Sequence, residues 1–205
     1  FLPLIKEEII KAKTSYKPHI TVYLSAISIK KQKKFFQKFP NFKFEIFHSQ
    51  CIKKEEFKNL SLSPLSEEFK ESLINCSGYI SQAGFESNAE ALYLQKPLIC
   101  IPIRQQYEQK CNGEALKDIG ATVLSKLKYN PVKLWLETKK PLEKIKIASA
   151  EELAKNILEK IKKVLENLIM NWLKIDNLYY QSQDKEFNLY IPCLNLSSDT
   201  ILING

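Results

Sequence analysis

The sequence has very little arginine, although it is basic overall. Of its 31 basic residues only Arg104 is arginine, and the formal net charge at pH 7 is +8. Proteins that read nucleic acid use arginine for bidentate contacts to bases and phosphates. A surplus made of lysine therefore predicts a solvated surface, or a weak attraction to anionic membranes, and argues against a nucleic-acid partner.

Metal ligands and disulfide partners are also scarce. The two histidines, His19 and His48, have no partner at metal-ligand spacing, and the five cysteines include no C-x-x-C pair. This pattern excludes a zinc site and a disulfide framework and predicts a reducing, cytoplasmic compartment. Cys76 and Cys100 lie in apolar surroundings, where we expect their thiols to act as small hydrophobic groups.

Long apolar runs are missing too. No stretch approaches the roughly 18 apolar residues of a transmembrane helix, and the apolar start is too short for a signal peptide. The chain begins at Phe1 rather than Met, so we expect further protein to precede it. Disorder is excluded by composition, because 11 Phe, 9 Tyr and 2 Trp within a 44% hydrophobic sequence require a core.

Strand and helix patterns alternate along the chain. Strands are expected at residues 20–25, 43–49, 60–63, 78–81, 97–103 and 120–125. Helices are expected at residues 28–39, 66–76, 86–94 and 107–119, with a longer one starting at a capping box at residues 149–152. The strand at residues 97–103 lacks a polar face, as in parallel sheets covered on both sides. The pattern predicts an α/β fold with a doubly wound, Rossmann-like parallel sheet.

We divide the chain into three parts. Residues 1–18 are predicted to be a lead-in or interdomain linker, residues 19–173 an α/β domain, and residues 174–205 a tail whose role stays open. The long helix carries one apolar face, made of Leu153, Ile157, Ile161, Val164, Leu165, Leu168 and Trp172.

Ligands of doubly wound sheets bind at the carboxyl ends of the strands, and residues 81–86 follow such an end. Gly84 would let the backbone approach a phosphate, and the next helix would supply its positive dipole. An ordinary tight turn is the alternative, since the chain has no G-x-G-x-x-G or Walker A motif. Glu90 could accept two ribose hydroxyl protons, or could form a capping box with Ser87.

A second polar loop, residues 102–109, follows the apolar strand. It holds Arg104 and ends in the pair Glu108 and Gln109, which suits sugar hydroxyls, although polar loops are ordinary at such positions.

Four stretches form an ordered series: residues 81–92, Lys96-Pro97-Leu98, residues 102–109 and Asn112-Gly113. Together they resemble the donor-binding half of GT-B glycosyltransferases. The closest resemblance is to the MurG-like group, which transfers N-acetylglucosamine from UDP-GlcNAc. It covers roughly residues 20–124 and the long helix. The chain would accordingly be the C-terminal half of a GT-B enzyme.

The resemblance implies roles at the phosphate end of the donor. The N–H groups of Gly84 and Phe85 would bind the diphosphate, and Ser25 would lie near the phosphates. Gln82 stands where many members of the group have His or Arg, which weakens any charge-based assistance to the leaving diphosphate.

It also implies roles at the nucleoside and the sugar. Glu90 would hold the ribose, and Pro64 and Leu65 would border the uracil. Glu108 and Gln109 would contact the hydroxyls of the donor sugar. Arg104, in the same loop, could approach a phosphate or pair with Glu108, and the sequence leaves both open.

The implied function is the UDP-sugar-binding half of an inverting glycosyltransferase, with UDP-GlcNAc as the expected donor. No metal or other cofactor is expected. The catalytic base would lie in an acceptor-binding half outside this chain, so we expect no catalytic residue here and no activity from the chain alone. One alternative is a stand-alone donor-binding subunit with a membrane-anchored partner. Another is a UDP-sugar epimerase or hydrolase of the same fold.

Two lysine-rich stretches, residues 30–43 and 155–174, are interpreted first as solvated faces. The alternative is a peripheral contact with anionic lipid, which would suit a lipid-linked acceptor.

Overall fold

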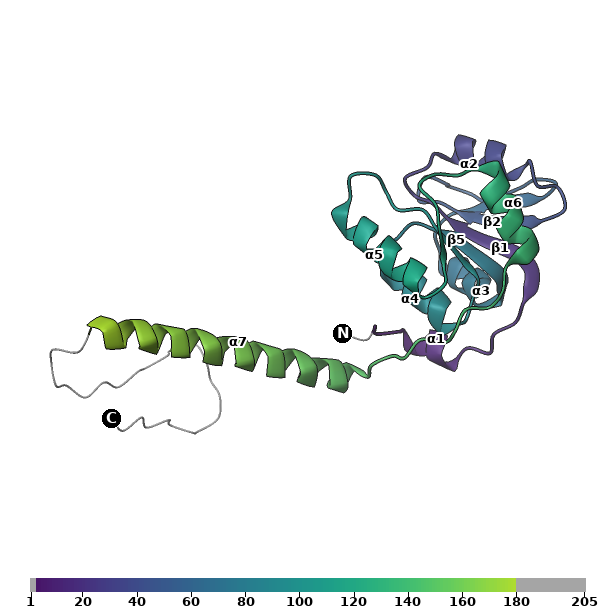
Figure 1. Ribbon diagram of the computed structural model, residues 1–205. Helices are drawn as coiled ribbons and strands as arrows, with labels where there is room; N and C mark the ends of the chain where they lie inside the picture. The colour runs from purple at the N-terminus through teal and green to yellow at the C-terminus, as the bar shows by residue number, and fades with distance from the viewer. Residues whose placement is uncertain (1–2, 180–205) are drawn as a thin grey trace. The chain divides into compact units, whose positions relative to one another are not determined.

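A seven-stranded sheet of order β3-β4-β2-β1-β5-β6-β7 forms the centre of the computed structural model (Figure 1), which describes residues 3–179, with side chains for residues 3–170. All neighbouring strands are parallel except β3 and β4. The strands are β1 (Lys17–Tyr23), β2 (Lys43–Phe47), β3 (Glu55–Glu56), β4 (Leu60–Ser63), β5 (Cys76–Ser81), β6 (Leu98–Cys100) and β7 (Thr122–Val123). The predicted α/β, Rossmann-like parallel sheet is confirmed.

Helices cover both faces of this sheet (Figure 1). They are α1 (Glu7–Lys11), α2 (Ile29–Phe36), α3 (Glu67–Asn75), α4 (Glu86–Tyr93), α5 (Tyr107–Asp118) and α6 (Tyr129–Thr138), followed by α7 (Ala150–Tyr179). One core cluster joins the sheet to α2 and α6 and includes Val22, Phe36 and Trp135. The other lies beneath α1, α3, α4 and α5 and includes Ile9 and Tyr79. Two apolar layers of this kind are what a sheet buried on both faces requires.

Several elements differ from the sequence-based expectation. The helices α1 and α6 and the short strand β3 had not been expected. The pattern of α6 is interrupted by Pro131, which the first turn of a helix tolerates, and its buried residues are Val132, Trp135 and Leu136. Strand β6 is shorter than residues 97–103, because Pro102 has no N–H group for a sheet hydrogen bond.

The chain forms two compact units, residues 1–150 and 151–205. The lead-in belongs to the first unit, because Ile5 and Ile9 are buried in its core, so residues 1–18 are not only a linker. Almost all of α7 belongs to the second unit, whereas the predicted domain extended to residue 173. The apolar face of α7 is exposed, with Leu158 at 66% and Val164 at 56%. The predicted face residue Trp172 and the whole tail at 174–205 lie outside the described side chains.

Candidate functional site

The carboxyl ends of the parallel strands form one edge of the sheet. The strand pairing sets six residues in a row across it: Ser63, Phe47, Tyr23, Ser81, Cys100 and Val123. The loops that carry the predicted site residues leave the sheet just after this row. The structure therefore brings those loops to one edge, as the sequence analysis required.

The strand order reverses direction between β1 and β5, because β2 and β4 continue on one side and β6 and β7 on the other. Such a switch point is where open α/β sheets bind ligands. The loops after these two strands are joined by a hydrogen bond of 2.7 Å, which Ser25 Oγ donates to Gln82 Oε1. Two predicted site residues thus meet at the switch point.

Side chains hold the loop between β5 and α4 by its carbonyl groups. Asn88 Nδ2 donates to the carbonyls of Gln82 and Gly84, both at 2.7 Å, and Asn88 Oδ1 accepts a hydrogen bond from Ser81 Oγ. Asn112 Nδ2 donates to the carbonyl of Ala83 at 3.0 Å. All three loop carbonyls are therefore occupied by side chains of α4 and α5.

The first turn of α4 has no side-chain cap. The first N–H groups of a helix have no acceptor within the helix and carry its partial positive charge. A Cβ atom built on Gly84 would meet nothing within 4 Å, so the space beside this backbone is open. Phe85 is 61% exposed. This end of α4 offers backbone donors to an anion approaching from outside.

The capping-box interpretation of Ser87 and Glu90 is wrong. Ser87 lies inside α4, after the N-cap residue Phe85, and its Oγ accepts a hydrogen bond from the hydroxyl of buried Tyr79 at 3.1 Å.

Glu90 is buried on α4, only 5% exposed, and its Oε1 has no hydrogen-bond partner. Burial raises the pKa of Glu90 above its usual value, and the positive charge of Lys6 opposes that rise. The distance from Lys6 Nζ to Glu90 Oε1 is 3.8 Å. A buried carboxylate oxygen without a donor can accept hydrogen bonds from hydroxyl groups that reach it.

The loop after β6 is braced by one of the predicted sugar ligands. Gln109 Oε1 accepts a hydrogen bond from the N–H of Ile103 at 2.9 Å. Glu108 is exposed on the first turn of α5, and within the described residues it forms no ion pair with Arg104. Arg104 lines a cavity of about 620 Å³, together with Lys110 and Val123 of β7.

Pro64 and Leu65 follow β4, which is separated from β1 by β2. Two strand spacings put them roughly 10 Å along the edge from the switch point. Leu65 is 46% exposed, so its side chain is available to a flat ligand group.

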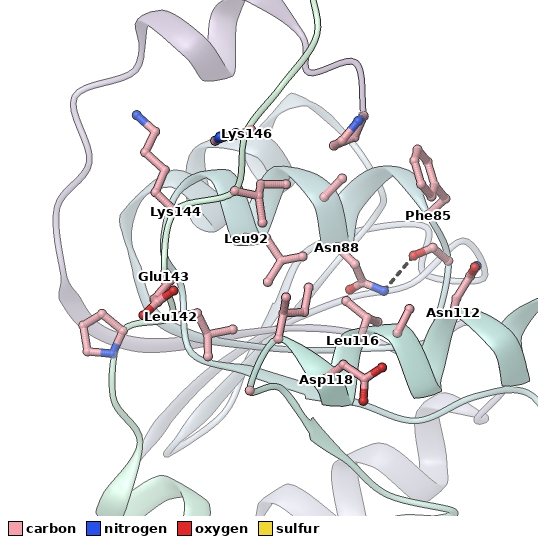
Figure 2. A pocket seen from close by; sticks show the side chains of 18 residues that line it. Phe85, Asn88, Leu92, Asn112, Leu116, Asp118, Leu142, Glu143, Lys144 and Lys146 are labelled. Carbon is pink, nitrogen blue, oxygen red and sulfur yellow. Dashed lines mark hydrogen bonds between the residues drawn. The ribbon is translucent and has the colours of Figure 1, made fainter. Parts of the chain in front are cut away.

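A larger cavity, about 840 Å³, lies between α4, α5 and residues 141–146 (Figure 2). Its lining is mainly apolar, with Leu92, Leu116 and Leu142 between the two helices. Of the predicted site residues only Gly84 and Phe85 line it. Figure 2 also shows the hydrogen bond from Asn88 to the loop. The predicted site residues therefore lie along an open edge that the two cavities flank, and neither of these two cavities contains all of them.

Two further observations bear on cofactors and membranes. Within residues 3–170, no three His, Cys, Asp or Glu side chains gather in a group that could hold a metal ion. In the described part of the chain, no helix has both the length and the apolar character needed to cross a membrane.

Sequence reasoning gave no role to three residues that shape this edge: Asn88, Asn112 and Lys6. For Asn88 the sequence offers only the fact that asparagine is a weak helix former, because its burial and its hydrogen-bond partners are seen only in the structure. Lys6 gave no signal, since nothing distinguishes it in sequence from the other lysines of the lead-in.

Comparison with known proteins gives one family. The chain matches the family described as Glycosyl transferase family 1 over residues 1–138. No match was found among curated proteins.

Among solved structures, similar chains include the glycosyltransferase SnogD from Streptomyces nogalater, with 18% identity, 60% of this chain and 34% of that chain covered, and a TM-score of 0.42. The glycotransferase of kitacinnamycin has 12% identity and a TM-score of 0.45, and the match covers 62% of this chain and 37% of that chain. ALG13 has 12% identity and a TM-score of 0.46, and the match covers 63% of this chain and 90% of that chain. The chain spans about a third of the length of the first two.

Proposed function

Because the chain belongs to glycosyl transferase family 1, we propose that it binds the nucleotide-sugar donor of a glycosyl transfer at the carboxyl edge of its sheet. The proposed donor is a UDP-sugar, with UDP-GlcNAc as the first candidate. In this proposal the chain is the C-terminal, donor-binding half of an inverting GT-B enzyme, and an acceptor-binding half supplies the catalytic base as a separate domain or partner subunit.

The observation that carries the proposal is the loop between β5 and α4. Its three carbonyls are tied inward by Asn88 and Asn112, while the first turn of α4 is uncapped beside the open space at Gly84. An anion at this position would meet N–H groups and the helix dipole rather than carbonyl oxygens. A diphosphate is the part of a UDP-sugar that needs such an environment, and it needs no metal there.

The other predicted residues fit a ligand extended along the same edge. The free oxygen of Glu90 suits a pair of ribose hydroxyls, and Pro64 and Leu65 offer a surface for a base. On the other side, Gln109 braces a loop whose neighbours Arg104 and Glu108 are exposed to a sugar. Nucleoside and sugar would thus extend in opposite directions from the diphosphate.

Isothermal titration calorimetry with UDP, UDP-GlcNAc and GDP tests the proposal. We expect heat of binding for the two uridine compounds, and weaker binding of both to the Glu90→Gln variant. The exposed α3 residue Glu71, away from the proposed site, gives a control, Glu71→Gln. If the folded protein releases no heat with UDP or UDP-GlcNAc at millimolar concentration, the proposal is wrong. No transfer of labelled sugar is expected from this chain alone.

A lipid surface is the second partner that we propose, on the strength of α7. A helical projection of residues 153–169 gathers their apolar side chains in one arc, flanked by Lys155 and Lys162 on one edge and Lys160 on the other. Glu159 and Glu166 project from the opposite side. Lysines at the borders of an apolar face can extend toward lipid head groups while their stems cover apolar surface.

Vesicle sedimentation tests this contact. We expect binding to vesicles of phosphatidylglycerol and phosphatidylcholine that is weakened by Leu158→Ser and Val164→Ser on the apolar arc. Asn156→Ser, on the polar face, should leave binding unchanged. Absence of vesicle binding at low and high salt would refute the proposal.

A further inference from the structure

The carboxylate of Glu90 occupies an unusual setting for a charged group. It is 5% exposed, and its Oε1 is buried without a hydrogen-bond partner. Burial favours the neutral form of a carboxyl group. A neutral carboxyl group offers one hydrogen-bond donor and a weaker acceptor, whereas a carboxylate accepts two hydroxyl donors at once. The ionisation of Glu90 therefore decides which ligands it can hold.

The nearest cation to Glu90 comes from the lead-in, not from the sheet or its loops. Lys6 Nζ lies 2.7 Å from Glu86 Oε1 and 3.8 Å from Glu90 Oε1. The hydrogen bond with Glu86 raises the pKa of Lys6, so the ammonium stays charged. Glu86 thus takes the hydrogen bond of the ammonium, and Glu90 receives only its electric field. Glu90 Oε1 is left buried and without a hydrogen-bond partner, so it can accept a hydrogen bond from another donor that reaches it.

Packing fixes the position of this ammonium group. Lys6 is the N-cap residue of α1, and its carbonyl accepts hydrogen bonds from the N–H groups of Ile9 and Ile10. Ile5 and Ile9, on either side in sequence, are buried in the core beneath α3 and α4. Glu8 pairs with Lys70 of α3. The backbone at Lys6 is therefore held against α4 by buried contacts and not by the ion pair alone.

Besides Lys6, three charged groups act on Glu90 from the elements around it. Glu86 on α4 and Glu8 on α1 favour its neutral form, and Lys70 on α3 favours its charged form. Tyr79 on β5 faces the same region but is buried and bonded to Ser87. Lys6 makes the largest contribution among those that favour the carboxylate.

We infer that Lys6 is a positioning residue, which holds Glu90 as a carboxylate and leaves its unpartnered oxygen to accept the hydroxyls of a cis-diol such as ribose. This inference rests on the proposed function and adds to it a part for the lead-in, because a residue before the sheet completes the nucleoside end of the site. It also predicts a pH range for binding, with the affinity for a diol falling as Glu90 takes up a proton.

The direct test needs no ligand. The side-chain carboxyl carbon of Glu90 is followed by ¹³C NMR between pH 4 and 9 in the unaltered protein and in Lys6→Met, Lys6→Arg and Lys11→Met. Lys11 is the matched control, because it lies on the same short helix and pairs with Glu7 on the solvent side. We expect the titration midpoint of the Glu90 carboxyl group to move to higher pH in Lys6→Met and to return to its value in the unaltered protein in Lys6→Arg. Lys11→Met should leave it in place.

The second measurement uses UDP and 2′-deoxy-UDP as probes across pH 5.5 to 8. UDP affinity should fall roughly three- to fivefold in Lys6→Met near the acid end of this range, the effect of one solvent-screened ion pair. The preference for UDP over 2′-deoxy-UDP should shrink with it. Lys6→Arg should restore both.

The two ideas fail in different ways. A Glu90 midpoint that is the same in Lys6→Met and the unaltered protein overturns the role of Lys6, whatever binds. A moved midpoint with an unchanged pH profile of UDP binding also overturns it. If the unaltered protein binds no UDP, the proposed function itself is wrong, and with it the diol-binding part of the inference.

Discussion

Replacing Asn88 by alanine tests the loop on which the proposed site depends. Asn88 is 1% exposed and makes three hydrogen bonds to oxygen atoms, at 2.7, 2.7 and 2.5 Å, besides a longer contact of 4.0 Å to Cys100 Sγ. Its removal leaves the carbonyls of Gln82 and Gly84 and the hydroxyl of Ser81 without these partners. Each such bond contributes about 1 kcal/mol net, and more where the abandoned group stays dry. Because Gly84 is partly exposed and can be hydrated, we expect a loss of about 2–4 kcal/mol in the free energy of unfolding.

Urea denaturation measures this loss. Trp135 reports on the first unit, so the series is made in a Trp172→Phe background, since these are the two tryptophans of the chain. Asn130→Ala, at an exposed position in the first turn of α6, is the control and should change stability by less than about 0.5 kcal/mol. UDP affinity should fall in Asn88→Ala and not in the control. A variant as stable as the unaltered protein that still binds UDP equally well would refute our account of the loop.

Three further predictions concern single groups of the first unit. Gly78→Ala places a Cβ atom 2.6 Å from a ring carbon of Trp135 on α6 and should lower the free energy of unfolding, measured with urea, by about 1–3 kcal/mol. Gly84→Ala, which meets no atom within 4 Å, should lower it by less than about 0.5 kcal/mol and yet weaken UDP binding. Burial raises the pKa of Glu90 in the folded state, so the free energy of unfolding falls as the pH rises from the ordinary pKa of a glutamate through the raised pKa of Glu90. Glu90→Gln should therefore stabilise the protein at pH 7 and not at pH 4. Stabilisation at pH 4 but not at pH 7 would contradict this reasoning. Burial raises the pKa of the Cys100 thiol to about 12, so mass spectrometry after alkylation at pH 8 should find exposed Cys111 modified and Cys100 intact.

The sheet could be predicted because its strands are short apolar runs separated by helices with clear periodicity. The strand at residues 60–63 was placed with its observed bounds, since it is apolar at Leu60 and Leu62 and ends before Pro64. Helix α6 was missed because Pro131 interrupts its pattern, although Pro is allowed in a first turn. Cys76 and Cys100 are fully buried, which confirms their interpretation as small hydrophobic groups.

The site could be predicted only as a set of loops. The rule that ligands gather at carboxyl strand ends brought Ser25, Gln82 and Gly84 to one edge, because strand register follows from the parallel pairing. The rule says nothing of the groups that hold those loops. Asn88 looks like any polar residue of a short helix until its three partners are seen. Lys6 acts on Glu90 across 84 positions of sequence, and only the packing of Ile5 and Ile9 determines that contact.

Two features of this edge leave a group unpartnered or strained in the isolated chain. Glu90 carries a buried oxygen without a hydrogen-bond partner, and Gln105, directly before the N-cap residue of α5, adopts a φ of 66°. Gln95 has a similar φ of 57°, but it follows the last turn of α4, where a left-handed residue closes the helix. The features at Glu90 and Gln105 each cost stability and gain nothing in the isolated chain. A diol would supply the missing partner of Glu90, and an anion would find open space beside the first turn of α4, which is why we propose the site at the open edge and not in the larger apolar cavity beside it.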